Sequence, residues 1–167
     1  MIISFGADLR GIEALGHLQD LLTRLGHEVH VVARSDAKSC DYPDIAYPVG
    51  AEVASGVAER GILLCGTGIG MSIAANKIKG VRAALVHDEI GAEISRRHND
   101  ANVLCLAADM LGIRFIDRIV ETWLGTDFEG GRHARRVGKI AAIEQGIDPA
   151  SLNENVAIEA PRPAAHL

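Results

Sequence analysis

Short apolar runs alternate along the chain with segments whose apolar residues recur every three or four positions. The short runs are typical of strands buried on both faces, and the longer period is typical of helices with one buried face. Leu15, Leu18 and Leu22 show the helical spacing in the first such segment, and Pro48 is expected in the first turn of a later helix. We expect strands over residues 2–5, 29–32, 61–65, 81–86 and 102–107. We expect helices around residues 12–25, 45–57, 71–77, 88–98, 115–123 and 132–145.

The alternation of strand and helix predicts the fold class. Five strands separated by helices indicate a parallel sheet that is covered by helices on both faces. We therefore expect an α/β fold in which residues 1–146 form a single domain. Residues 147–167 are rich in Pro, Ala and Asn and lack an apolar period, so they are expected to form a C-terminal tail that is either disordered or packed on a partner subunit.

Composition and charge narrow the class of protein. The chain has 167 residues, 48% hydrophobic and 23% charged, which suits one soluble domain with a sizeable core. Its formal net charge of −5 disfavours nucleic-acid binding. No apolar run approaches the length of about 18 residues that spans a membrane, and no basic signal segment precedes the first strand. Cys40, Cys65 and Cys105 lack CxxC spacing, which disfavours disulfides and zinc, so we expect a cytoplasmic protein.

The strand expected over residues 61–65 runs directly into a glycine-rich turn that contains Gly66, Gly68 and Gly70. In open parallel sheets, ligands bind at the carboxyl ends of the strands. The G-x-G-x-G spacing differs from the G-x-G-x-x-G of dinucleotide-binding proteins, although Asp88 lies at the distance expected of their acidic residue. An anion or oxyanion cradle is therefore favoured over nucleotide binding, and tight strand-to-helix packing is the alternative without a ligand.

Two further residues are expected at the same edge of the sheet. Cys65 ends the strand before the turn, where the start of a helix favours the reactive thiolate, although free cysteines are often simply buried. Asp8 follows the first strand and is expected near Cys65, either as a functional carboxylate or as a turn or N-cap residue.

Basic side chains gather in two places in the second half of the chain. His98 lies at the end of a predicted helix, where it is either a partner of the helix dipole or a group that carries a proton near neutral pH. Arg132 and Arg136 are spaced i, i+4, so they either clamp a phosphate together or form a solvated helix face.

The motif around the glycine turn closely resembles the signature of the type B ribose-5-phosphate isomerases, a family that includes the galactose-6-phosphate isomerase subunits. The motif reads ILLCGTGIGMSIAANK over residues 62–77. Three further segments match in the same order, namely DYP at residues 41–43, SRRHNDANVL at 95–104 and FEGGRH at 128–133. The resemblance runs from the N-terminus to about residue 146 and is highly specific, because several separate motifs carry it.

The resemblance implies a Rossmann-like sheet and a homodimer or tetramer with active sites at the subunit interface, and it implies no metal and no nucleotide cofactor. Cys65 would be the base that moves a proton between C1 and C2 of a phosphorylated sugar. Thr67 and the amides of residues 66–70 would hold the enediolate oxygen, and Asp8 would move a proton between the two sugar oxygens. The remaining implied residues are His98 for ring opening with Asn99 beside it, Arg132 and Arg136 for the phosphate, and Tyr42 for the pocket wall.

The chain departs from the family at one position. Members typically carry a histidine after the first aspartate, whereas Leu9 stands here and is followed by Arg10, a candidate replacement charge at the substrate. We expect an aldose–ketose isomerase with ribose 5-phosphate as the default substrate. A four-carbon or six-carbon sugar phosphate is the first alternative. A nucleotide-binding oxidoreductase and a non-catalytic sugar-phosphate-binding subunit are alternatives from other classes.

Overall fold

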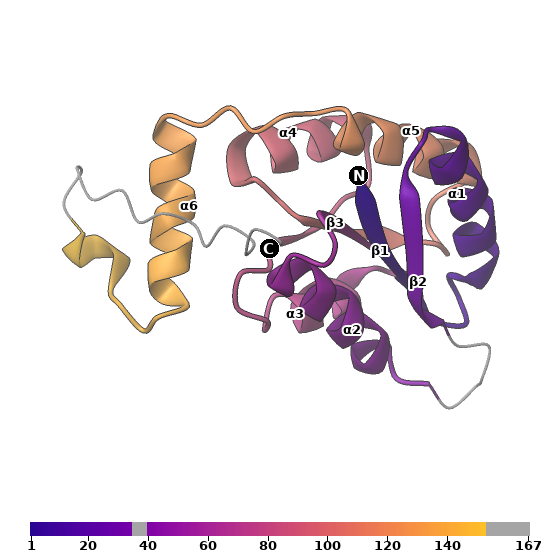
Figure 1. Ribbon diagram of the computed structural model, residues 1–167, viewed down its shortest axis with the longest axis horizontal. Helices are drawn as coiled ribbons and strands as arrows, with labels where there is room; N and C mark the ends of the chain where they lie inside the picture. The colour runs from indigo at the N-terminus through magenta and orange to yellow at the C-terminus, as the bar shows by residue number, and fades with distance from the viewer. Residues whose placement is uncertain (35–39, 153–167) are drawn as a thin grey trace.

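Five parallel strands form one sheet in the order β2-β1-β3-β5-β4 in the computed structural model, which describes residues 1–34 and 40–152 (Figure 1). The strands are β1 (Ile2–Ala7), β2 (Glu28–Arg34), β3 (Arg60–Cys65), β4 (Ala83–Leu85) and β5 (Val103–Ala107). Parallel pairing places Cys65 at the end of β3 level with Ala107 at the end of β5. The predicted α/β fold with a five-stranded parallel sheet is confirmed.

Helices cover both faces of this sheet (Figure 1). They are α1 (Ile12–Arg24), α2 (Tyr42–Ser55), α3 (Ile69–Ala75), α4 (Glu89–Asn99), α5 (Ile113–Leu124) and α6 (Arg132–Ile143), followed by the 3-10 turn η1 (Pro149–Ser151). The face covered by α1, α4 and α5 receives Leu64, whereas the face covered by α2 and α3 receives Leu63. Because both faces are covered, β3 is apolar at every position between its first residue and the turn.

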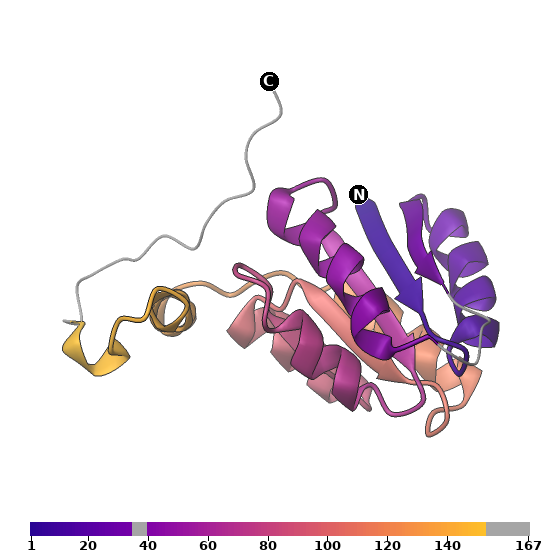
Figure 2. The same ribbon diagram turned by 90° about the horizontal axis from the view of Figure 1, so that it is seen from below.

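The helix α6 stands apart from the sheet, and Figure 2 shows it end-on beside the body of the domain. It packs on α4, and Glu144, directly after it, accepts hydrogen bonds from the Gly80 amide at 3.1 and 3.2 Å. Val137, Ala141 and Ala142 are its buried apolar residues. Within residues 1–34 and 40–152, no helix has the length and apolar character needed to cross a membrane.

Two local predictions were wrong. The helix expected around residues 45–57 begins at Tyr42 and ends at Ser55, where Gly56 adopts φ 80° and leaves Val57 outside. Pro48 therefore lies inside the helix instead of in its first turn, where its missing N–H removes one hydrogen bond. Of the predicted tail, residues 147–152 include η1, and residues 153–167 lie outside the described part of the chain.

Candidate active site

The thiol of Cys65 lies at the tip of the central strand and is tied to the glycine turn. Only 5% of Cys65 is exposed, and the amide of Gly68 donates a hydrogen bond to its Sγ at 3.0 Å. Gly68 has φ 72°, and a Cβ there would lie 2.5 Å from Leu85 Cδ1 and 3.1 Å from the carbonyl carbon of Leu106. The turn therefore requires glycine at this position for both its backbone angle and its space.

The turn also presents backbone donors. Among the described residues, the amides of Thr67 and Gly70 donate to no protein acceptor, and the exposed Thr67 hydroxyl accepts only a long bond of 3.4 Å from the Ile69 amide. The ring of Tyr42, at the start of α2, lies over Gly70, where a Cβ would come within 2.7 Å of Tyr42 Cε2. The structure therefore places Tyr42 beside the glycine turn, and its role in the pocket wall stays a prediction.

Asp8 lies at the same edge, because β1 and β3 are parallel neighbours. Its amide donates to the Leu64 carbonyl at 3.1 Å, next to Cys65. Its Oδ1 accepts a hydrogen bond of 2.9 Å from the Arg10 amide, so Asp8 closes a turn, whereas Gly11 is the N-cap of α1. Of the two structural roles expected for Asp8, the structure shows the turn.

The side chain of Arg10 is engaged by a residue that the sequence did not point to. Its Nε contacts Asp109 Oδ1 and Oδ2 at 3.0 and 2.9 Å, and its Nη2 lies 2.8 Å from Oδ2. The hydrogen bond that Arg10 donates to Asp109 raises the pKa of the guanidinium above its ordinary value. Asp109 borders the turn, since a Cβ on Gly66 would lie 2.6 Å from its Oδ2. The position after Asp8 is held by Leu9, which is 46% exposed.

Cys105 was predicted from the sequence to be a core residue. It lies on β5, the neighbour of β3, close to the sheet edge that carries the Cys65 thiol, called the thiol edge below. It is fully buried in β5. Burial raises the pKa of its thiol far above the usual range, with a smaller contribution from Cys65. Cys105 therefore stays protonated at neutral pH, and Cys65 is the cysteine that can take part in chemistry at this edge.

His98 and Asn99 lie at the opposite edge of the sheet, because α4 runs back toward the start of β5. The ring of His98 stacks on the buried ring of His133, with centroids 4.1 Å apart and planes inclined by 5°. Glu129 faces both rings at 4.0 and 3.9 Å from their Nε2 atoms. Arg132, at the start of α6, donates from Nε to His133 Nε2 at 3.3 Å.

Electrostatics at this second group favour an anion over a cation. The ligand atoms of His98, Glu129 and His133 lie within 4.8 Å of one another, as a metal site would require. However, Arg97 donates a hydrogen bond of 2.9 Å to Glu129 and lowers the pKa of that carboxyl group. Arg132 donates a hydrogen bond to His133 Nε2, the atom that would bind a metal. Burial, followed by the charges of His98 and Arg132, lowers the pKa of His133. The excess of positive charge suits a phosphate.

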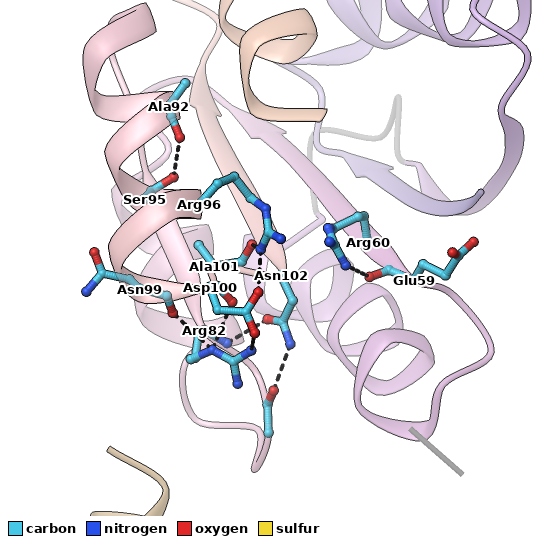
Figure 3. A network of polar contacts seen from close by, with 11 residues as sticks. Glu59, Arg60, Arg82, Ala92, Ser95, Arg96, Asn99, Asp100, Ala101 and Asn102 are labelled. Atoms are coloured by element: carbon cyan, nitrogen blue, oxygen red, sulfur yellow. Dashed lines mark hydrogen bonds and ion pairs between the residues drawn. The ribbon is translucent and has the colours of Figure 1, made fainter. Parts of the chain in front are cut away.

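A network of arginines fixes the end of α4 at Asn99 and Asp100 (Figure 3). Asp100 ends the helix with φ 46°. Within residues 1–34 and 40–152, it is the only non-glycine residue with a positive φ. Its carboxylate accepts from Arg82 Nη2 and from Arg96 Nη1, each at 2.8 Å. Arg82 Nε donates to the carbonyls of Asn99 and Asp100 at 3.2 and 2.9 Å. The backbone next to His98 is therefore held from two sides.

Positive charge is buried in this network. Arg96 is 3% exposed, and its guanidinium lies 5.7 Å from the centroid of the Trp123 ring. Burial and the nearby charge of Arg96 lower the pKa of Arg60, whose side chain faces Arg96 in Figure 3. Asp100 is the carboxylate that hydrogen-bonds Arg96, so the network depends on it.

Within one chain, the two groups of residues are separated. Cys65 is level with Ala107, and Gly61 at the opposite end of β3 is level with Val103. The four steps from Val103 to Ala107 span about 13 Å, because each strand residue advances the chain by about 3.3 Å. Cys65, Asp8, Thr67 and Tyr42 therefore gather at one edge, whereas His98, Asn99, Arg132 and Arg136 lie on elements beyond the other.

The fold and the thiol edge are those of an α/β enzyme, a sugar-phosphate isomerase and thus an intramolecular oxidoreductase. The chain belongs to the ribose/galactose isomerase family, whose model matches residues 3–140. It is 43% identical over 143 residues to ribose-5-phosphate isomerase B of Escherichia coli, covering 86% of this chain and 96% of that protein. It is 40% identical over 143 residues to D-erythrulose-4-phosphate isomerase of Pectobacterium atrosepticum, covering 85% and 94%. The structure of ribose-5-phosphate isomerase B of Clostridium thermocellum matches with a TM-score of 0.83 and 44% identity over 87% and 99% of the two chains.

Proposed function

We propose that this enzyme interconverts ribose 5-phosphate and ribulose 5-phosphate, with Cys65 as the base. The observation that carries the proposal is the thiol at the tip of β3, which accepts the Gly68 amide beside the unoccupied backbone donors of Thr67 and Gly70. Two of the three relatives described above carry the name of this activity. The fully buried Cys105 offers no alternative thiol.

The arrangement matches the needs of an enediolate reaction. Cys65 Sγ takes a proton from C2 of the open-chain aldose and returns it to C1, while Asp8 moves a proton from the C2 hydroxyl to the C1 oxygen. The negative charge that develops on oxygen between these steps is met by the amides of Thr67 and Gly70. The proton count is unchanged overall, as an isomerisation requires.

The site is completed by a second copy of the chain. The two edges lie about 13 Å apart, a distance that side-chain rotation cannot cross. His98, Arg132 and Arg136 therefore act on the sugar that is bound at the Cys65 edge of a partner chain. Apolar side chains flank both edges, including Ile73 at 57% and Ile143 at 59% exposure. A hollow of about 590 Å³ lies between the segment after α3, the end of α4 and the end of α6. These surfaces support a homodimer with shared sites.

The length of the sugar depends on Leu9. Leu9 follows Asp8 directly and offers no side-chain hydrogen bond to a substrate, and Arg10 beside it forms an ion pair with Asp109. The resemblance to a D-erythrulose-4-phosphate isomerase makes a four-carbon substrate the second candidate. Turnover of ribose 5-phosphate, erythrose 4-phosphate and allose 6-phosphate, compared by kcat/KM, tests the order.

The Cys65→Ser variant tests the base. In deuterium oxide, the wild type is expected to exchange the C1 hydrogen of ribulose 5-phosphate, as followed by NMR. Cys65→Ser should lower this exchange by about 10³-fold, the size of a lost general base. Cys40→Ser is the matched control, because the Cys40 thiol packs at the margin of the core, 3.7 Å from the Asp41 carbonyl, and has no part in the proposed reaction, so it should exchange normally. Exchange at the wild-type rate in Cys65→Ser would remove Cys65 from the mechanism.

Mixing Cys65→Ser with Arg136→Ala tests the shared site at a substrate concentration far below the wild-type KM, where weak substrate binding makes Arg136→Ala nearly inactive. Cys65→Ser lacks the thiol edge, and Arg136→Ala lacks part of the other edge. Random mixing should restore about a quarter of the wild-type activity, because half of the dimers are mixed and each holds one intact site. Activity that stays at the level of the separate variants would show that each chain builds its whole site alone.

A further inference from the structure

The imidazole of His133 is an ionisable side chain that is only 2% exposed, and it lies against His98. The two rings are parallel within 5°, with centroids 4.1 Å apart, so the face of one ring covers the face of the other. His133 belongs to the first turn of α6 and is buried where α6 packs on α4. The proposed function uses His98 but leaves His133 without a role.

The segment before α6 is tied to α4, which fixes the distance between the two rings. The Glu129 amide donates to the Arg97 carbonyl at 3.0 Å, and Arg97 Nη2 donates back to Glu129 Oε2 at 2.9 Å. Gly130 and Gly131 then turn the chain with φ 71° and 54° into α6. The position of His133 next to His98 is thus set by contacts between Glu129 and Arg97 that do not depend on either ring.

The charged groups that face the imidazole pair come from α4, from the segment before α6 and from α6. Glu129 is the carboxylate, at 4.0 Å from His98 and 3.9 Å from His133. The cations are Arg97, Arg132 and Arg136. Burial, followed by the charges of His98, Arg132 and Arg136, lowers the pKa of His133, so the His133 ring is neutral at neutral pH.

We propose that His133 is a positioning residue for His98. The buried ring of His133 fixes the plane in which His98 presents its N–H to the ring oxygen of a cyclic aldose phosphate. This inference rests on the proposed function, which gives His98 the ring-opening step. In that step the bond between C1 and the ring oxygen breaks and the C1 carbonyl forms. The ring oxygen gains a proton from His98, and the C1 hydroxyl loses one to water.

A positioned ring is needed because His98 is otherwise poorly restrained. Its side chain is 35% exposed, and its contact with Glu129 at 4.0 Å is longer than a hydrogen bond. Proton transfer requires the donor within hydrogen-bond reach and in line with the acceptor. The stacked face of His133 restricts the tilt of the His98 ring, whereas Asp100 and its arginines fix only the backbone.

The test separates ring opening from the enediolate step. Ribulose 5-phosphate cannot form a furanose, so exchange of its C1 hydrogen in deuterium oxide needs Cys65 but not ring opening. Turnover of ribose 5-phosphate, which is cyclic in solution, needs both. His133→Ala should lower kcat for ribose 5-phosphate by about 10-fold or more and leave C1 exchange within about 2-fold. His133→Phe keeps a stacked ring and should recover most of kcat.

Three outcomes overturn the inference: equal losses in both assays, no loss in either, or a rise in KM with kcat unchanged, which would assign His133 to the phosphate. Thermal unfolding of both variants shows whether they fold, and the Phe variant keeps the test valid if the Ala variant does not. Normal exchange in Cys65→Ser would instead overturn the proposed function, so the two failures are distinguishable. A wild type that exchanges no ribulose 5-phosphate would overturn both.

Discussion

The amide of Gly68 points at the sulfur of Cys65 across 3.0 Å, so the proposed base and the turn that follows it form one structural unit. The residue that supplies this amide adopts φ 72°, which glycine tolerates and other residues rarely do. The angle that aims the amide at the thiol also leaves the neighbouring amides of Thr67 and Gly70 open for another acceptor. A change at Gly68 should therefore affect base and donors together.

Gly68→Ala should lower stability by about 1–3 kcal/mol because of its backbone angle, and its Cβ would also lie 2.5 Å from Leu85. Turnover should fall by about 10²-fold or more, as when a preorganised donor is lost. Gly146→Ala is the matched control, because Gly146 has the same φ of 72° with no atom within 4 Å. Urea unfolding and kcat check both variants. Equal loss of kcat in the two would contradict the special place of Gly68.

Asp100→Asn should destabilise the fold by about 3 kcal/mol, because it leaves the charge of the buried Arg96 without its anion. Asparagine tolerates the positive φ of this position, so the effect reports the lost charge and not backbone strain. Glu93→Ala is the control, since it removes an exposed ion pair with Arg97 that contributes about 0.5 kcal/mol or less. Urea denaturation measures both. A similar loss in the two variants would count against the buried network.

Arg136→Ala should raise KM for the phosphorylated sugar by about 10- to 100-fold, the size of a lost hydrogen bond between charged groups. Because a phosphate anchor contributes mainly uniform binding, kcat should change little. Lys139→Ala removes one positive charge from the same helix and should leave KM nearly unchanged. Steady-state kinetics at fixed ionic strength tests the pair, and an unchanged KM in Arg136→Ala would exclude this arginine from the site.

The stability of the protein should fall as the pH drops below about 6.5, the ordinary value for histidine. Burial lowers the pKa of His133 in the folded chain, so the unfolded chain binds this proton first. The stabilisation is complete above the unfolded pKa and is lost as the pH falls toward the folded value. His133→Phe should lose less stability between pH 7.5 and 5.5 in urea unfolding. His87→Asn, at an exposed position, should follow the wild type.

The residues at the thiol edge could be predicted from the sequence because the topology alone brings them together. Once β1 and β3 are parallel neighbours, Asp8 and Cys65 must share an edge, and the glycine spacing marks the turn. The roles given to these residues stay predictions, as do those of His98, Asn99, Arg132 and Arg136. The local errors concern Pro48 and the helix end at Ser55, where packing of α2 outweighs propensity.

The contacts that the sequence did not indicate join residues far apart in the chain. Arg10 meets Asp109, and Arg82 meets Asp100, only after crossovers between strands have formed. The stacking of His133 on His98 likewise depends on how α6 packs against α4, which no periodicity specifies. By contrast, the ion pair of Arg96 and Asp100 could have been predicted from the sequence, because i, i+4 spacing on a helix is a local signal.

The distance between the two edges of the sheet has a consequence for how the enzyme can evolve. If each site draws its thiol from one chain and its arginines from another, selection acts on the two edges separately. After a gene duplication, one copy can lose the edge of Cys65 and the other copy the edge of Arg136, and the pair still assembles one working site. A homodimer built this way is already prepared to become an enzyme of two different subunits.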